Sequence, residues 1–141
     1  MAEKLRAIPL GGLGEIGKNM MALELAGDLI LVDAGLMFPE EDMLGVDLVI
    51  PDISYVEERL HKLRGIIITH GHEDHTGALP YVLPRLRLAN GKLPPVYCTR
   101  LTRGLINVKL EEHRLAKQAD LRLVRPGERV KLGRLRWSSS T

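Results

Sequence analysis

Ile66-Ile67-Ile68-Thr69 runs directly into His70-Gly71-His72-Glu73-Asp74-His75. The β-branched residues predict a buried strand, and the run after it places three imidazoles and two carboxylates at the end of that strand. Neutral imidazole and carboxylate are the ligands that zinc and manganese prefer in proteins. We therefore expect a metal-binding catalytic site at the junction between this strand and the run that follows it. A polar surface turn is the competing interpretation.

The spacing of this run suits two adjacent metal ions. His70 and His72 can point to one side of a strand-to-helix turn, and Asp74 and His75 can reach a neighbouring position. In two-metal hydrolysis the ions lie about 3.5–4 Å apart and lower the pKa of a shared water, which a carboxylate such as Asp74 can orient. The run differs from the HExxH helix of metalloproteases, because Thr76 stands four residues after His72.

Apolar periodicity predicts strands and helices on both sides of this junction. Their interleaving, without an internal repeat, predicts a layered α/β fold that opens with a hairpin. Arg64-Gly65 is expected to end the first helix. The expected elements are strands over 5–10, 21–25 and 29–32, a helix over 53–63, a strand over 66–69, a helix over 76–88, a strand over 95–99, a helix over 101–115, and strands over 121–124, 129–132 and 135–137.

Size and composition limit the class of protein. The 141 residues and 15.7 kDa correspond to one domain. No apolar run approaches the roughly 18 residues that span a bilayer, and residues 1–10 lack the apolar segment of a signal peptide. Cys98 is the only cysteine, so an intrachain disulfide and a thiolate zinc cluster are excluded. We expect a cytoplasmic protein that does not insert into membranes.

Charge is distributed unevenly along the chain. Residues 1–99 carry 9 Lys/Arg and 14 Asp/Glu, which gives −5, whereas residues 100–141 carry 11 and 4, which gives +7. Such a division is typical of a basic face for a polyanion, and solvated helix faces are the competing interpretation.

Gly12-Leu13-Gly14-Glu15-Ile16-Gly17 matches the glycine pattern of dinucleotide-binding folds, and Asp33 lies 33 − 14 = 19 residues after its middle glycine. That fold needs a helix at the last glycine and a long crossover to a parallel strand. Only residues 19–25, with period-two apolar spacing, precede the expected turn at 26–28. We therefore reject dinucleotide binding and expect the glycines to allow a close approach of the loop between two hairpin strands.

Several motifs together resemble the ribonuclease J family of the metallo-β-lactamase superfamily, over residues 5 to 135. The resemblance implies a metallo-β-lactamase-like αββα sandwich of which residues 1–141 are the N-terminal part, without the β-CASP and C-terminal domains. It also implies a zinc-dependent ribonuclease of rRNA processing and RNA decay, with endonuclease and 5′-to-3′ exonuclease activity, that forms a homo-oligomer at full length. The motifs are Gly11–Asn19, Val32–Gly35, Phe38–Asp52, Ile68–Gly77 and Lys109–His113.

The resemblance also assigns metal ligands. His70 and His72 would hold one zinc, and Asp74 and His75 would hold the other and act as catalytic residues. Manganese or magnesium are the alternative ions. Asp33 matches an acid that orients the site through hydrogen bonds, and a turn-forming Asp before Ala-Gly is the competing interpretation.

Other polar residues are assigned smaller roles. Asp47 is the candidate ligand of a structural calcium that the resemblance implies near the second loop, and a solvated acidic loop competes with it. His61 and His113 lie beside charged residues on or near expected helices, so we place both at the surface.

The chain lacks the later histidines and the bridging Asp of the family. Two zinc ions need about six protein positions, and this run supplies four. We therefore expect a fragment that binds metal weakly, cleaves RNA little and exposes the sheet face that the missing half would cover. The alternatives are a hydrolase of the same superfamily that acts on thioesters or other small molecules, and a non-catalytic metal- and RNA-binding module that contacts RNA through basic residues after Arg100.

Overall fold

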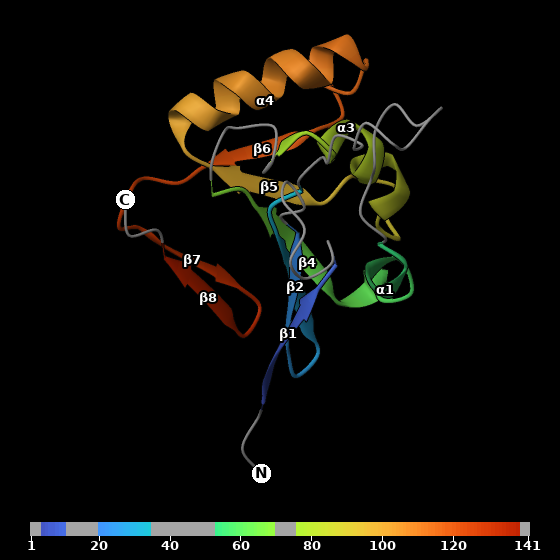
Figure 1. The fold of residues 1–141 in the computed structure, drawn as a ribbon, viewed down its shortest axis with the longest axis vertical. Helices are drawn as coiled ribbons and strands as arrows, with labels where there is room; N and C mark the ends of the chain where they lie inside the picture. The colour runs from blue at the N-terminus through green and yellow to red at the C-terminus, as the bar shows by residue number, and fades with distance from the viewer. Residues whose placement is uncertain (1–3, 11–19, 35–52, 70–75, 139–141) are drawn as a thin grey trace, which may run out of the picture.

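The computed structural model describes residues 4–10, 20–34, 53–69 and 76–138 as a mixed α/β fold (Figure 1). Within these residues six strands form one sheet in the order β1-β2-β3-β4-β5-β6, and β7 pairs with β8 in a separate hairpin. The strands are β1 (Leu5–Pro9), β2 (Met21–Leu25), β3 (Asp28–Val32), β4 (Leu63–Ile67), β5 (Pro95–Cys98), β6 (Asp120–Leu123), β7 (Arg129–Leu132) and β8 (Leu135–Ser138), and the α-helices are α1 (Ser54–Glu57), α3 (Leu79–Val82) and α4 (Arg100–Glu112).

Strand direction changes along the main sheet. β1, β2 and β3 pair in antiparallel fashion, which confirms the predicted opening hairpin, whereas β3, β4, β5 and β6 pair in parallel. The antiparallel β1–β2 pair also confirms that the chain after the glycine loop does not cross over to a parallel strand. Because parallel strands end at the same edge, the carboxyl ends of β3 to β6 lie together.

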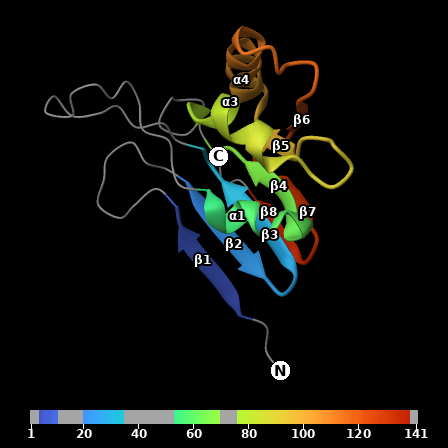
Figure 2. The same ribbon diagram turned by 90° about the vertical axis from the view of Figure 1, so that its right-hand side faces the viewer.

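Alternation along the strands sends side chains to two apolar clusters on opposite faces of the sheet. Leu29 and Leu31 join the larger cluster with residues of all three α-helices, while Ile30 between them joins the smaller one. The three helices therefore cover one face of the sheet, with α3 and α4 over β4 to β6 (Figures 1 and 2).

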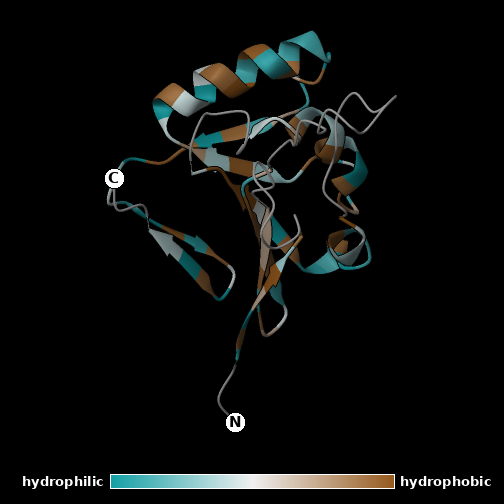
Figure 3. Cartoon of the chain, viewed as in Figure 1, coloured by the Kyte–Doolittle hydropathy of each residue, from teal (hydrophilic) through white to brown (hydrophobic). Residues whose placement is uncertain are grey.

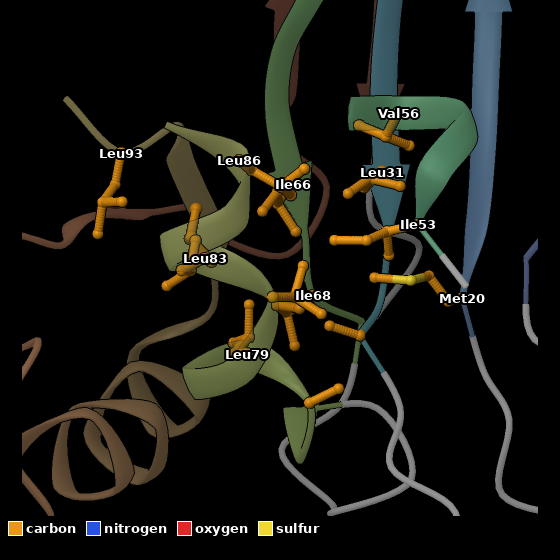
Figure 4. Packing of buried hydrophobic residues seen from close by; sticks show 14 of the residues in the cluster. Met20, Leu31, Ile53, Val56, Ile66, Ile68, Leu79, Leu83, Leu86 and Leu93 are labelled. Carbon is orange, nitrogen blue, oxygen red and sulfur yellow. The ribbon is translucent and has the colours of Figure 1, made fainter. Parts of the chain in front are cut away.

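Helix α4 is amphipathic. Thr102, Ile106 and Leu110 are buried, and their spacing of four residues places them in one stripe that faces the sheet. Hydrophobic and hydrophilic residues accordingly alternate along this helix, whereas the central strands are mainly hydrophobic (Figure 3). The larger cluster packs between β3, β4 and the helices α1 and α3, as Figure 4 shows from close by.

The β7–β8 hairpin covers the opposite face. Its Leu132 and Leu135 are buried against Ile30 and Ile67. Gly65 allows this approach, because a Cβ there would lie 3.1 Å from Leu132 Cδ2 and 3.2 Å from the carbonyl of Pro95. The expectation that this face is left exposed is therefore wrong where the hairpin lies.

The expected helix over 53–63 is shorter than its periodicity suggests. α1 ends at Glu57, a 3-10 turn spans Leu60–Lys62, and β4 begins at Leu63, so Arg64-Gly65 lies inside a strand and does not end a helix. Parallel pairing of β4 with β3 satisfies the backbone from Leu63 onward, which overrides the local helical spacing.

The expected helix over 76–88 is also interrupted. α3 covers Leu79–Val82, and a 3-10 turn follows at Leu83–Leu86. Pro84 has no N–H to donate to the carbonyl of Pro80 four residues earlier, so an α-helix cannot continue through it. The remaining elements match their predicted ranges to within three residues at each end. No helix in the described ranges is long and apolar enough to cross a bilayer.

Candidate metal centre

Asp33 follows β3 at the edge where the parallel strands end. Its backbone has φ of 64°, and its N–H donates to the carbonyl of Ile67 at 2.7 Å. The residue is 6% exposed. The chain thus turns sharply after β3 while one more hydrogen bond to β4 holds the carboxylate inside the molecule.

The Asp33 carboxylate binds the residue that precedes the His/Asp run. Its Oδ1 accepts the backbone N–H of Thr69 at 2.7 Å, and the Thr69 hydroxyl lies 2.7 Å from Oδ2 and 3.0 Å from Oδ1. Two charge-assisted hydrogen bonds from one residue fix both its backbone and its side chain. Thr69 is therefore held in place directly before His70.

The described chain after the run is tied to the same strand end. Ala78 donates its backbone N–H to the carbonyl of Ala34 at 2.8 Å, and Thr76 is buried at 5% exposure. Asp33 and Ala34 are adjacent, so Thr69 before the run and Ala78 after it are tied to consecutive residues. The described chain on both sides of the predicted ligand run is thereby tied to the end of β3.

The predicted ligands themselves lie outside the described residues. His70, His72, Asp74 and His75 belong to the segment 70–75, and Asp47 and the loop over 11–19 also fall outside it. Within the ranges that the structure describes, no three His, Cys, Asp or Glu residues come close enough to hold a metal ion.

The two other histidines are at the surface, as predicted. His61 lies in the 3-10 turn before β4. His113 follows α4 and contacts the ring of Tyr81 edge-on, with 5.2 Å between ring centroids. Neither is assigned to the metal centre.

The interpretation of Asp33 as a local turn former is incomplete, because its carboxylate binds a residue 36 positions later. Thr69 is the partner that sequence reasoning missed. Its position directly before the first histidine was the available signal. The bond between Ala34 and Ala78 had no sequence signal, since it joins two backbone groups.

Cys98 ends the neighbouring strand β5 on the larger apolar cluster. Burial raises the pKa of its thiol to about 11, while the charge of Arg103 acts in the opposite direction. Because a thiolate is the form that binds metal, this protonated thiol is poorly suited as a ligand. The predicted donors for a metal at this edge remain the imidazoles and carboxylates of the run after Thr69.

This donor set fits a metal centre of the hydrolytic kind. Three imidazoles and the Asp74 carboxylate stand within six residues, and Asp33 and Ala34 hold Thr69 before them and Ala78 after them. Such anchoring outside the ligands orients them and raises metal affinity in known sites.

In this sheet the parallel strand β4 leads into a His/Asp run, and helices cover one face. The comparison with known families identifies the class of protein that has this arrangement. The family model of the metallo-beta-lactamase superfamily matches residues 13–136, and the chain belongs to this superfamily. Among solved structures it is similar in fold to rubredoxin oxygen:oxidoreductase from Desulfovibrio gigas, with TM-score 0.54 and 21% identity over 84% of this chain and 25% of that one. A diphosphatase of the PhnP family has TM-score 0.51 and 22% identity over 80% of this chain and 39% of that one.

Within that class, the chain is similar to proteins named ribonuclease J. It is 44% identical to ribonuclease J of Thermus thermophilus, over 94% of this chain and 23% of the relative. Identity is 42% to ribonuclease J of Synechocystis, over 94% and 20%, and 47% to ribonuclease J2 of Bacillus subtilis, over 85% and 20%. The chain spans about a fifth of the length of these relatives.

Proposed function

We propose that this chain carries the first metal-binding part of a ribonuclease that hydrolyses RNA phosphodiester bonds with two zinc ions. The observation that supports this proposal most directly is that Thr69 and Ala78, on either side of the segment 70–75, are hydrogen-bonded to the adjacent residues Asp33 and Ala34. Identity of 42–47% to three proteins named ribonuclease J supports RNA as the proposed substrate. The finer activity is endonucleolytic and 5′-to-3′ exonucleolytic cleavage in rRNA processing and RNA decay in the cytoplasm.

The ligand roles are those that the resemblance to ribonuclease J implies. His70 and His72 would hold one ion, and Asp74 and His75 would hold the other and act as catalytic residues. Bound zinc lowers the pKa of a water and stabilises negative charge on the substrate oxygen. Manganese and magnesium are the alternative ions, and a structural calcium is assigned to Asp47.

Asp33 is a positioning residue in this proposal. Its carboxylate accepts two hydrogen bonds from Thr69, so the peptide that leads into His70 has a fixed orientation. An imidazole presented from a fixed backbone loses less conformational entropy on binding metal than one presented from a free loop. The contribution of Asp33 is therefore to metal affinity and geometry.

Four ligands do not complete a site for two ions, which needs about six protein positions. We place the remaining ligands in the longer protein, which we propose to be a homo-oligomer. The 141-residue chain by itself is then expected to bind zinc weakly and to hydrolyse RNA little.

The test uses a chimaera in which this chain replaces the matching first part of the Thermus thermophilus relative. We expect the chimaera to hydrolyse a labelled single-stranded RNA when supplied with zinc, and His72→Ala to abolish hydrolysis. His61→Ala is the matched control, because His61 is an exposed histidine outside the run. Zinc binding by the isolated chain and its His72→Ala variant is measured in parallel by competition with a chromogenic chelator.

Two results would contradict the proposal. Hydrolysis of a thioester but not of RNA by the chimaera would favour a small-molecule hydrolase. RNA binding without hydrolysis would favour the non-catalytic module.

A further inference from the structure

A groove of about 460 Å³ lies between helix α4 and strand β6. The two elements run side by side in both ribbon views (Figures 1 and 2). On the helix side it is lined by Arg100, Arg103 and Asn107, and on the other side by Ala119 and Asp120. The groove therefore presents two guanidinium groups along one helix face.

These two arginines differ from most other arginines of the main sheet and its helices. Arg59, Arg64, Arg85 and Arg122 each form an ion pair with a carboxylate, and Arg87 donates to Gln118 and Gly91. Arg100 and Arg103 are exposed, and neither side chain has a hydrogen bond or ion pair with a described residue. Their guanidinium donors are available to a ligand.

The acidic groups near the groove are already engaged. Asp120 lines it, but its carboxylate pairs with Arg122 at 2.8 Å. Glu111, one helical turn beyond Asn107, accepts the side-chain amide of Asn107 at 3.1 Å. Among the residues that line the groove, Asp120 is the acid and is paired with Arg122, so Arg100 and Arg103 give the groove a net positive charge and its ligand should be an anion.

The groove begins at the sheet edge that carries the proposed metal centre. Arg100 is the first residue of α4 and directly follows Thr99, just beyond β5. β5 pairs in parallel with β4, and Ile68 donates its backbone N–H to the carbonyl of Tyr97 at 2.9 Å. Thr99 and Thr69 thus occupy equivalent positions after neighbouring strands.

We propose that the α4–β6 groove binds the phosphodiester backbone of single-stranded RNA, with Arg100 and Arg103 each contacting a phosphate. This inference rests on the proposed function, and it extends the path of the RNA from the metal centre along α4. No aromatic side chain among the described residues lines the groove, so bases cannot stack there and binding is independent of sequence. It also gives a specific location to part of the positive charge of residues 100–141.

The experiment measures binding of a fluorescein-labelled single-stranded RNA to the metal-free chain by anisotropy, so that hydrolysis does not consume the probe. The variant is Arg100→Gln/Arg103→Gln. The matched control is Arg129→Gln/Arg136→Gln, which removes the same charge from exposed residues of β7 and β8. Each protein is titrated at several salt concentrations between about 50 and 200 mM, a range in which phosphate contacts change affinity strongly.

We expect the groove variant to bind about tenfold more weakly at low salt, and its log–log salt slope to be shallower by about 1.4, the value for two phosphate contacts on a single strand. The control should change affinity by less than about twofold, as expected for a long-range charge effect alone. Gly104→Glu gives a second variant, because Gly104 lines the groove and an added Cβ meets no atom within 4 Å. It should weaken binding, whereas Gly104→Ala should not.

Unchanged binding in the groove variant, an equal loss in the control, or no RNA binding by the wild-type chain would each overturn this inference. The chimaera separates it from the proposed function. RNA hydrolysis by the chimaera with unchanged binding in the groove variant would refute the groove alone. Loss of binding in the groove variant without hydrolysis by the chimaera would refute the ribonuclease and leave the groove.

Discussion

Two buried aspartates stand at the two ends of strand β3, and they use the same chemistry for different purposes. Asp28 is 8% exposed and Asp33 is 6% exposed. Asp28 accepts hydrogen bonds from Arg64 Nε at 2.6 Å and from the backbone N–H of Arg134 at 2.7 Å. Asp33 accepts its bonds from the backbone and hydroxyl of Thr69.

The partners of each aspartate decide its role. Arg134 lies in the turn of the β7–β8 hairpin, so Asp28 ties that hairpin to the sheet. Thr69 leads into the His/Asp run, so Asp33 holds the approach to the proposed metal centre. A buried carboxylate that accepts a backbone N–H is thus not by itself a sign of function, and the segment that it fixes carries the information.

The largest effect is expected in the turn that rests on Asp28. Gly133 has φ of +64°, and a Cβ on it would contact the Asp28 carboxylate, whereas Gly127 has φ of +82° and open space around it. Gly133→Ala should lower the free energy of unfolding by about 3 kcal/mol and Gly127→Ala by about 1 kcal/mol, because only the first adds a clash to the left-handed backbone strain. Urea unfolding measures both.

A double variant tests whether contact with the Asp28 carboxylate causes the loss of stability in Gly133→Ala. Gly133→Ala should cost less in the background of Asp28→Ala, where the carboxylate is gone. Equal costs for the two glycines would show that Asp28 does not restrict this turn.

Asp28→Ala alone should lower the free energy of unfolding by about 2 kcal/mol, because it removes the carboxylate that accepts the Arg134 N–H and Arg64 Nε. Zinc affinity should not change, since Asp28 lies at the opposite end of β3 from Thr69. Urea unfolding and chelator competition on the same preparation check the two statements. A parallel loss of zinc affinity would remove the distinction between the two aspartates.

Asp33→Ala should show the reverse pattern, with zinc affinity reduced about tenfold or more, the usual cost of losing a group that positions a metal ligand. Thr69→Val keeps the backbone N–H that bonds to Asp33 and should cost less, while Thr69→Ser should restore wild-type affinity. Chelator competition gives the three affinities. An unchanged affinity in Asp33→Ala would return Asp33 to the role of a turn residue.

The smallest expected effect is the dependence of the free energy of unfolding on acidic pH. The hydrogen bond from Arg64, followed by that from Arg134, lowers the pKa of Asp28, and the bond from Tyr55 lowers the pKa of Glu24. A carboxylate whose pKa is lowered by folding stabilises the fold above its unfolded pKa, and this stability is lost as the pH falls below about 4. Urea unfolding should therefore show a fall in stability in this range. Asp28→Ala should fall less steeply than wild type, and an identical pH dependence would contradict the role of Arg64.

Local sequence was sufficient to identify an element where apolar spacing alone determines it. The β-branched run of β4, the alternation in β2 and the turn before β3 identified their strands, because a buried strand needs little beyond apolar spacing. The same spacing misled at 53–63, where pairing with β3 takes Leu63 into a strand, and at 76–88, where Pro84 ends the helix early.

The proposed metal centre shows the same difference between what local sequence predicts and what tertiary structure decides. The sequence by itself predicted the types and order of the proposed ligands and the acid at Asp33, because residue types and their spacing are properties of the chain alone. Only the tertiary structure decided that Asp33 binds Thr69, that Ala34 holds Ala78, that the hairpin covers the second sheet face and that Arg100 and Arg103 line a groove beside β6. The physical reason is that each of these contacts joins residues far apart in the chain, and strand pairing and packing bring them together.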